Sequence, residues 1–186
     1  MKIGLQTWGS NGDIRPIIAL ADGLQKAGHS VTLVVSSVDN RSYRETCAEL
    51  AIPYRQIPEH IEFDMQEFAQ CTFKMNTLQW LIALLDAAFF PYEQELYSAA
   101  KQLAAENDLV IGHHFLYPLK LAAKKQQIPH VSITYCHGAI PTLTKPPFKF
   151  PDLGKWLNRL QWRLLDYTFD WGLKQRLSQL WLQEGM

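Results

Sequence analysis

The sequence is poor in cysteine, in charge of one sign and in long apolar runs. Its three cysteines, Cys47, Cys71 and Cys136, are odd in number and far apart, which argues against a disulfide framework and favours a reducing cytoplasm. The 18 basic and 18 acidic residues cancel, so no global field favours nucleic acid as a partner. No signal-peptide pattern stands at the start, and the longest apolar stretch, residues 81–90, is broken by Asp86 and is too short to span a bilayer. We expect a cytoplasmic protein, at most peripheral to the inner face of a membrane.

The first sixteen residues, by contrast, carry a dense pattern. Lys2–Trp8 reads as a buried strand, Gly9–Gly12 as a tight turn, and residues 14–24 have the apolar spacing of a helix. Asp13 stands just before that helix. Open α/β sheets bind ligands where the strands end, so this carboxylate is expected at a ligand-binding edge.

The rest of the chain alternates between helical and strand patterns. With 47% hydrophobic residues in 186, it is long enough for one sizeable core, and we expect one domain over residues 1–186. Further strands are predicted at residues 31–35, 52–57, 108–112 and 129–134, and helices at 40–51, 78–105 with a break at Pro91, 115–125 and from 153 onward. Residues 59–77 read as a loop with a short helix, and 138–151 as a proline-rich loop. This order predicts an α/β fold with a Rossmann-like, doubly wound parallel sheet.

The glycine-rich turn also resembles a known signature. Gly9-Ser10-Asn11-Gly12-Asp13-Ile14-Arg15-Pro16 is similar to the Gly-Ser-x-Gly-Asp-x-x-Pro motif at the amino terminus of a glycosyltransferase family. That family contains sterol glucosyltransferases, the rhamnosyltransferase of rhamnolipid synthesis and the transferases of vancomycin-type antibiotics. Ala27-Gly28-His29 and the later strands match as well, so the resemblance spans essentially the whole chain.

The resemblance implies one half of a GT-B fold, in which two Rossmann-like domains face each other across a cleft. Residues 1–186 would be the amino-terminal, acceptor-binding domain, without the carboxyl-terminal domain that binds most of the nucleotide-sugar. The expected function is part of an inverting, metal-independent transfer of a hexose from a nucleotide-diphosphate sugar to a hydroxyl of a lipid, sterol or other small hydrophobic acceptor. The isolated domain is expected to be nearly inactive, and no cofactor is implied, because the nucleotide-sugar is a co-substrate.

Asp13 matches the residue that the family is thought to use as general base, a role that glycosyl transfer to a hydroxyl requires. The alternative is that Asp13 only caps the first helix, a contribution of about 1 kcal/mol. The turn residues are expected to approach the phosphates or the sugar of the donor with their backbone N–H groups: Gly9, Ser10, Asn11 and Gly12. The alternative is a plain turn without a binding role. Arg15-Pro16 replaces the third glycine of the dinucleotide fingerprint, so NAD binding is rejected.

The expected acceptor contacts lie near the ends of the strands or in the proline-rich loop. These residues are Trp8, His113, His114, Phe115, His137 and Phe148. Related plant enzymes place an acid near His113 to support a catalytic histidine, whereas this sequence has two histidines there, one of which could support Asp13. The alternatives are polar loop residues for the histidines and ordinary core for the aromatics. No metal site is expected, because no Cys or carboxylate stands at ligand spacing from these histidines.

The sequence leaves two further kinds of partner possible, a membrane and a second copy of the chain. Residues 145–163 interleave bases with aromatics and could lie on an anionic membrane, with a solvated face as the alternative. An exposed interdomain face could drive homodimerisation of the isolated domain. The competing function is a non-catalytic, Rossmann-like module that binds a ligand or a partner.

Overall fold

The structure, a computed structural model, describes residues 1–135, 140–147, 150–165, 167 and 180. It divides into two compact units, residues 1–133 and 134–186, which are described separately. The elements of the first unit are β1 (Lys2–Gly9), α1 (Asn11–Lys26), β2 (Ser30–Ser37), α2 (Arg44–Glu49), β3 (Tyr54–Gln56), α3 (Met65–Thr72), α4 (Thr77–Ala88), η1 (Phe90–Tyr92), α5 (Glu93–Glu106), β4 (Leu109–His113), α6 (Tyr117–Gln126) and β5 (His130–Ile133).

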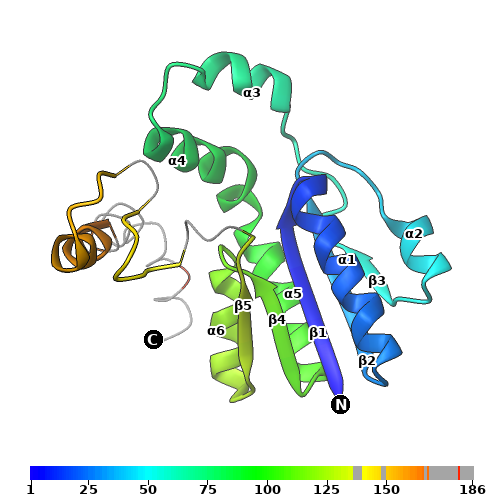
Figure 1. Cartoon of the computed structure of the whole chain (residues 1–186). Coiled ribbons are helices and arrows are strands. Elements are labelled where there is room, and N and C mark those ends of the chain that lie inside the picture. Colours follow the sequence, from blue (N-terminus) through cyan, green and yellow to red (C-terminus); the bar gives the residue numbers. More distant parts are fainter. Residues whose placement is uncertain (136–139, 148–149, 166, 168–179, 181–186) are drawn as a thin grey trace. The chain divides into compact units, whose positions relative to one another are not determined.

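The five strands form one parallel sheet in the order β3-β2-β1-β4-β5 (Figure 1). Each connection between neighbouring parallel strands carries a helix, as parallel strands require. The strand order reverses direction at β1, because β2 and β3 extend to one side of it and β4 and β5 to the other. The predicted Rossmann-like, doubly wound α/β fold is therefore confirmed.

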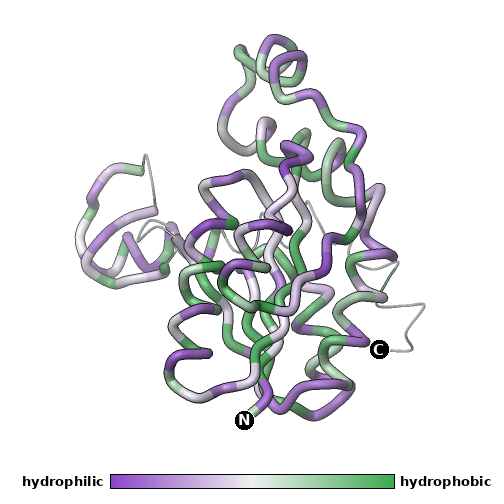
Figure 2. The backbone as a smooth tube through the Cα atoms, turned by 90° about the vertical axis from the view of Figure 1, so that its right-hand side faces the viewer, coloured by the Kyte–Doolittle hydropathy of each residue, from purple (hydrophilic) through white to green (hydrophobic). Residues whose placement is uncertain are grey.

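One face of the sheet packs on α1 and α2. Ile3 and Leu5 of β1 point into this layer, where they join Ile14 and Ile17 of α1 and Cys47 of α2. All five are almost fully buried. The odd-numbered residues of β1 thus face this core, and in Figure 2 hydrophobic stretches run through the middle of this unit.

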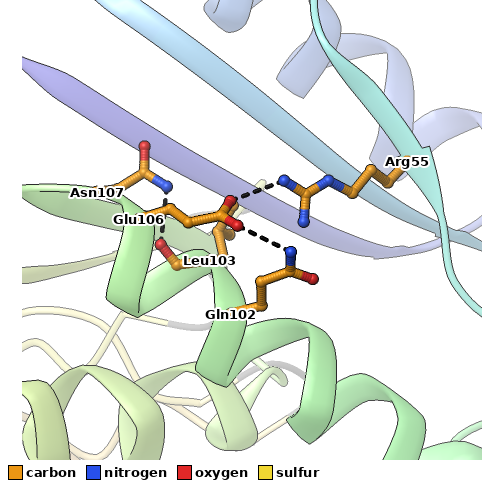
Figure 3. A network of polar contacts seen from close by, with 5 residues as sticks. All are labelled: Arg55, Gln102, Leu103, Glu106 and Asn107. Carbon is orange, nitrogen blue, oxygen red and sulfur yellow. Dashed lines mark hydrogen bonds and ion pairs between the residues drawn. The ribbon is translucent and has the colours of Figure 1, made fainter.

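The other face of the sheet packs on α5 and α6. Gly4 of β1 allows α5 to approach closely, because a Cβ there would lie 2.5 Å from Cγ of Leu103. Arg55 of β3 pairs with Glu106 at 2.7 Å, and Gln102 also donates to that carboxylate (Figure 3). The hydrogen bond from Arg55 and, to a smaller extent, the one from Gln102 lower the pKa of Glu106. The pair is partly exposed and contributes at most about 1 kcal/mol.

Helices α3 and α4 lie beyond the carboxyl edge of the sheet (Figure 1). The indole Nε1 of Trp8, near the end of β1, donates to the carbonyl oxygen of Ala88, the last residue of α4, at 3.1 Å. The same ring meets Phe89 edge-on, with centroids 5.4 Å apart. Pro91 lies in η1 between α4 and α5, so the break predicted in residues 78–105 is confirmed.

Several predicted boundaries are wrong. The helix predicted at 40–51 is only α2, because Asn40 has φ 52° and its side-chain amide binds both backbone polar groups of Ile61. The strand predicted at 52–57 shrinks to the three residues of β3, between two prolines. The helix predicted at 115–125 begins at Tyr117.

In the second unit, residues 155–165 are helical, as the tail pattern predicts. Trp162 Nε1 donates to the carbonyl oxygen of Lys145 at 3.0 Å, and Asn158 Nδ2 donates to Asp152 at 2.9 Å. Polar contacts with the preceding loop therefore hold this helix. Over the residues that the structure describes, no helix is both long and apolar enough to cross a bilayer.

Candidate functional site

The candidate site lies where the sheet reverses its strand order. β1 and β4 are neighbours, yet the chain leaves β1 into α1 on one face and β4 into α6 on the other. The carboxyl ends of these strands, at Gly9 and His113, therefore border the position where open α/β sheets bind ligands.

The Asp13 carboxylate is held against the end of β1. Its Oδ2 accepts hydrogen bonds from the backbone N–H of Ser10 at 2.9 Å and from the Ser10 hydroxyl at 3.1 Å. Ser10 is the N-cap and α1 begins at Asn11, so Asp13 is the third helical residue and not the N-cap itself. The carboxylate that completes this capping box is only partly buried, and a ligand can approach it.

Gly9 makes room for that carboxylate. Its φ of 142° belongs to a region that side chains rarely adopt, and a Cβ added there would lie 2.4 Å from Oδ2 of Asp13. Strand β1 must therefore end in glycine for the carboxylate to lie over it. The predicted tight turn is shorter than expected, because Asn11 and Gly12 already belong to the first turn of α1.

His113 lies on the same face of the sheet as Asp13. Ile111, two residues earlier in β4, joins the core layer of α1, and side chains two apart along a strand share a face. His113 is 5% exposed, and this burial, followed by the charge of His114, lowers its pKa to about 4, while the charge of Asp13 acts in the opposite direction. The imidazole is therefore neutral at pH 7. Its Nδ1 accepts the N–H of Phe115 at 3.4 Å, which places the proton on Nε2.

His114 and Phe115 continue the site as a cluster of rings. The His114 centroid lies 4.3 Å from that of His113 and 4.1 Å from that of Phe115. Partial desolvation lowers the pKa of His114, and the charge of Asp13 again opposes the shift. Three of the predicted acceptor contacts thus come together, and both histidines interact electrostatically with Asp13.

The remaining predicted residues are placed differently. Trp8 is buried, with its Nε1 bound to Ala88, so the structure gives it a packing role, and its contact with an acceptor stays a prediction. Asn11 Oδ1 accepts the hydroxyl of Tyr43 at 3.1 Å. Asn11 and Gly12 have first-turn N–H groups without intrahelical acceptors, and a role for these groups toward phosphate also stays a prediction. His137 and Phe148 lie outside the described residues.

Glu93, the first residue of α5, is a buried acid that the sequence analysis does not single out. It is 9% exposed, and its Oε1 has no hydrogen-bond partner within the described ranges. Burial raises the pKa of Glu93 to about 7. The sequence carries a signal for this burial, because Glu93 shares helical spacing with Leu96, Tyr97 and Ala100, all of which are buried.

A cavity of about 580 Å³ adjoins the site at the end of β2. Its lining includes Val38, whose N–H donates to the carbonyl oxygen of Gly9 at 3.0 Å, together with Asp39, Asn40 and residues 60–65 and 67. This volume suits a small organic ligand. Within the part of the chain that the structure covers, no three His, Cys, Asp or Glu side chains are grouped to hold a metal ion.

Comparison with known proteins supports a glycosyltransferase relationship. No family model matches the chain. It is 27% identical over 137 residues to O-mycaminosyltylonolide 6-deoxyallosyltransferase of Streptomyces fradiae, a match that covers 73% of this chain and 31% of that protein. It is 33% identical over 95 residues to sterol 3-beta-glucosyltransferase of Kluyveromyces lactis, covering 47% of this chain and 8% of that protein. The chain thus matches less than a third of the length of either relative.

The fold has a solved counterpart. The glycosyltransferase SsfS6 of Streptomyces sp. SF2575 matches with a TM-score of 0.52 and 20% identity, over 71% of this chain and 38% of that one. At this identity the match shows the fold alone. Together with the two sequence matches, it shows that this chain has distant similarity, over part of its length, to GT-B glycosyltransferases, and has the Rossmann-like fold of their domains.

Proposed function

We propose that this chain is the acceptor-binding half of an inverting glycosyltransferase with Asp13 as its general base. The reaction would move a hexose from a nucleotide-diphosphate sugar to a hydroxyl of a lipid, sterol or other small hydrophobic acceptor. One observation carries the proposal: the Asp13 carboxylate lies over Gly9 at the point where the strand order reverses, beside His113. We also propose that a second domain holds most of the nucleotide-sugar donor.

The chemistry that we assign to Asp13 is a single displacement. The acceptor oxygen attacks the anomeric carbon and its proton passes to the Asp13 carboxylate. The bond between the anomeric carbon and the diphosphate oxygen breaks, and the nucleoside diphosphate leaves with the electron pair. Ser10 donates two hydrogen bonds to Oδ2, and these bonds orient the carboxylate for this proton transfer.

His113 would act as a positioning residue beside the base. Its imidazole is neutral at pH 7, because burial holds its pKa near 4, and it therefore keeps one donor, at Nε2. A neutral donor next to Asp13 can orient the carboxylate or the incoming hydroxyl without neutralising the base. The partly exposed rings of His114 and Phe115 would border the acceptor.

The test uses the complete transferase, including its donor-binding domain. UDP- and dTDP-hexoses would be the donors, and a sterol and O-mycaminosyltylonolide the acceptors, after the names of the two relatives. Asp13→Asn keeps an oxygen that can accept the Ser10 N–H but removes the basic carboxylate. We expect kcat to fall by about 10²–10⁴ with an unchanged melting temperature.

Asp22→Asn is the matched control, because it makes the same change in the same helix. Asp22 pairs with Lys26 in a surface i,i+4 contact, and the loss of this contact should leave kcat unaffected. Near-normal turnover of Asp13→Asn would refute the assignment of the base. If the wild-type protein binds an acceptor but transfers no sugar from any donor, the chain is a non-catalytic binding module.

A further inference from the structure

The helix of the second unit exposes an apolar stripe to solvent. Six large apolar side chains of this segment are between 48% and 85% exposed: Leu153, Trp156, Leu157, Leu160, Leu164 and Tyr167. Trp156, at 85%, is the most exposed of them. Exposed apolar residues are ordinary when scattered, but six within one short segment mark an interaction surface.

Four of these side chains lie in the helix at residues 155–165 and share one side of it: Trp156, Leu157, Leu160 and Leu164. At about 100° of rotation per residue, these four positions fall within an arc of about 100°. The opposite side is already occupied, because Asn158 and Trp162 are 1% and 7% exposed and bind the preceding loop. The helix therefore packs on its own unit with one face and leaves a second apolar face without a cover among the described residues.

Cations border the stripe on one flank. Lys155, Arg159 and Arg163 follow each other at four-residue spacing and are all exposed. The sole acid in residues 140–165 is Asp152, whose carboxylate accepts hydrogen bonds from Gly154 and Asn158. The segment 153–167 holds these three cations and one acid, Asp166 near its end, so its net charge is positive.

We propose that residues 153–167 dock on the surface of an anionic lipid bilayer, with the apolar stripe in the interface and the basic row toward the headgroups. An interfacial helix buries its apolar face at the boundary of headgroups and acyl chains, and tryptophan and tyrosine favour that depth. The long stems of Lys155, Arg159 and Arg163 let their charges reach lipid phosphates from beside the stripe. Charge complementarity favours this occupant over a second copy of the chain, because the same segment of a second copy carries three cations against the single acid Asp166 and would repel this one.

The experiment measures binding of the full chain to vesicles. The protein is sedimented with phosphatidylcholine vesicles that contain either no anionic lipid or about 30% phosphatidylserine. We expect binding to the anionic vesicles only, weakened by added salt. The double variant Arg159→Glu, Arg163→Glu should bind about 30-fold more weakly, since each lost cation near the surface contributes about 1 kcal/mol.

The control Arg41→Glu, Arg44→Glu makes the same charge change at two exposed arginines of the first unit and should bind like the wild type. A second variant, Trp156→Ser with Leu160→Ser, removes apolar area from exposed positions, where folding is insensitive. It should also lose vesicle binding at an unchanged melting temperature. Equal binding by both arginine variants would overturn the proposal. So would a chain that ignores anionic vesicles and instead dimerises through the stripe, seen by sedimentation velocity as a dimer that Trp156→Ser, Leu160→Ser dissolves.

Discussion

The two units use their apolar side chains in opposite ways. In residues 1–133, Ile3, Leu5 and Leu33 are at most 2% exposed within a sheet covered on both faces, whereas in the second unit Trp156 and Leu160 are 85% and 49% exposed. In the second unit, the helix at residues 155–165 is held by hydrogen bonds to carbonyl and carboxylate oxygens of the preceding loop. Apolar burial therefore stabilises the first unit, whereas the exposed apolar residues of the second unit are available for contacts with another surface.

The sharpest way to break this comparison is to truncate one leucine in each region. Leu5→Ala removes a fully buried side chain from the core between β1 and α1 and should cost about 2–5 kcal/mol of unfolding free energy. Leu160→Ala, the same change on the exposed stripe, should stay within about 0.5 kcal/mol of the wild type. Urea unfolding followed by circular dichroism measures both. Equal losses would show that the stripe is part of a folded core.

A second test compares Gly9, the last residue of β1, with Gly23 near the carboxyl end of α1. Gly9→Ala places a Cβ against the Asp13 carboxylate at a φ of 142°, and we expect a loss of about 1–3 kcal/mol. Gly23→Ala, within α1 and with open space around it, should instead gain about 0.5–1 kcal/mol of unfolding free energy. Thermal unfolding measures both. A Gly9→Ala protein as stable as the wild type would contradict the close packing of Asp13 on the strand end.

The sequence was sufficient for the parts of the fold in which neighbouring residues decide the structure. Apolar runs predict β2 and β4, a buried-strand pattern before a glycine turn predicts β1, and Pro91 predicts the break before α5, because strand burial and proline geometry are local. The helix at 40–51 was overpredicted because the contact that stops it, from Asn40 to Ile61, joins residues that are 21 apart.

The candidate site was predictable to the same extent. The place of Asp13 at the end of β1 follows from strand, glycine and helix in sequence, and the meeting of Asp13 with His113 follows once β4 is placed beside β1. The roles of Ser10 as N-cap and Asp13 as the partner in the capping box depend on the residue at which α1 begins. Helix boundaries are the least predictable feature of a sequence, with errors of a few residues. The burial of Glu93 depends on the packing of α5, although its spacing pointed inward.

Glu93 is an exception to this comparison, because the interior of the first unit also contains a carboxylic acid, whose Oε1 has no hydrogen-bond partner among the residues that the structure describes. Burial raises the pKa of Glu93 from 4.5 to about 7. Between these pH values the folded state binds more protons than the unfolded state, so stability falls as the pH rises through that range.

Glu93→Gln cannot ionise at this position. The variant should match the wild type near pH 4 and be more stable by about 1–3 kcal/mol above pH 7. His113, whose pKa is lowered to about 4, has the opposite effect between pH 6.5 and 4, but it is present in both proteins and cancels in the difference. Urea unfolding of both proteins across this pH range measures that difference. A pH-independent difference would mean that Glu93 is hydrated, and the first unit would then be less dry at the start of α5 than its core is around Leu5.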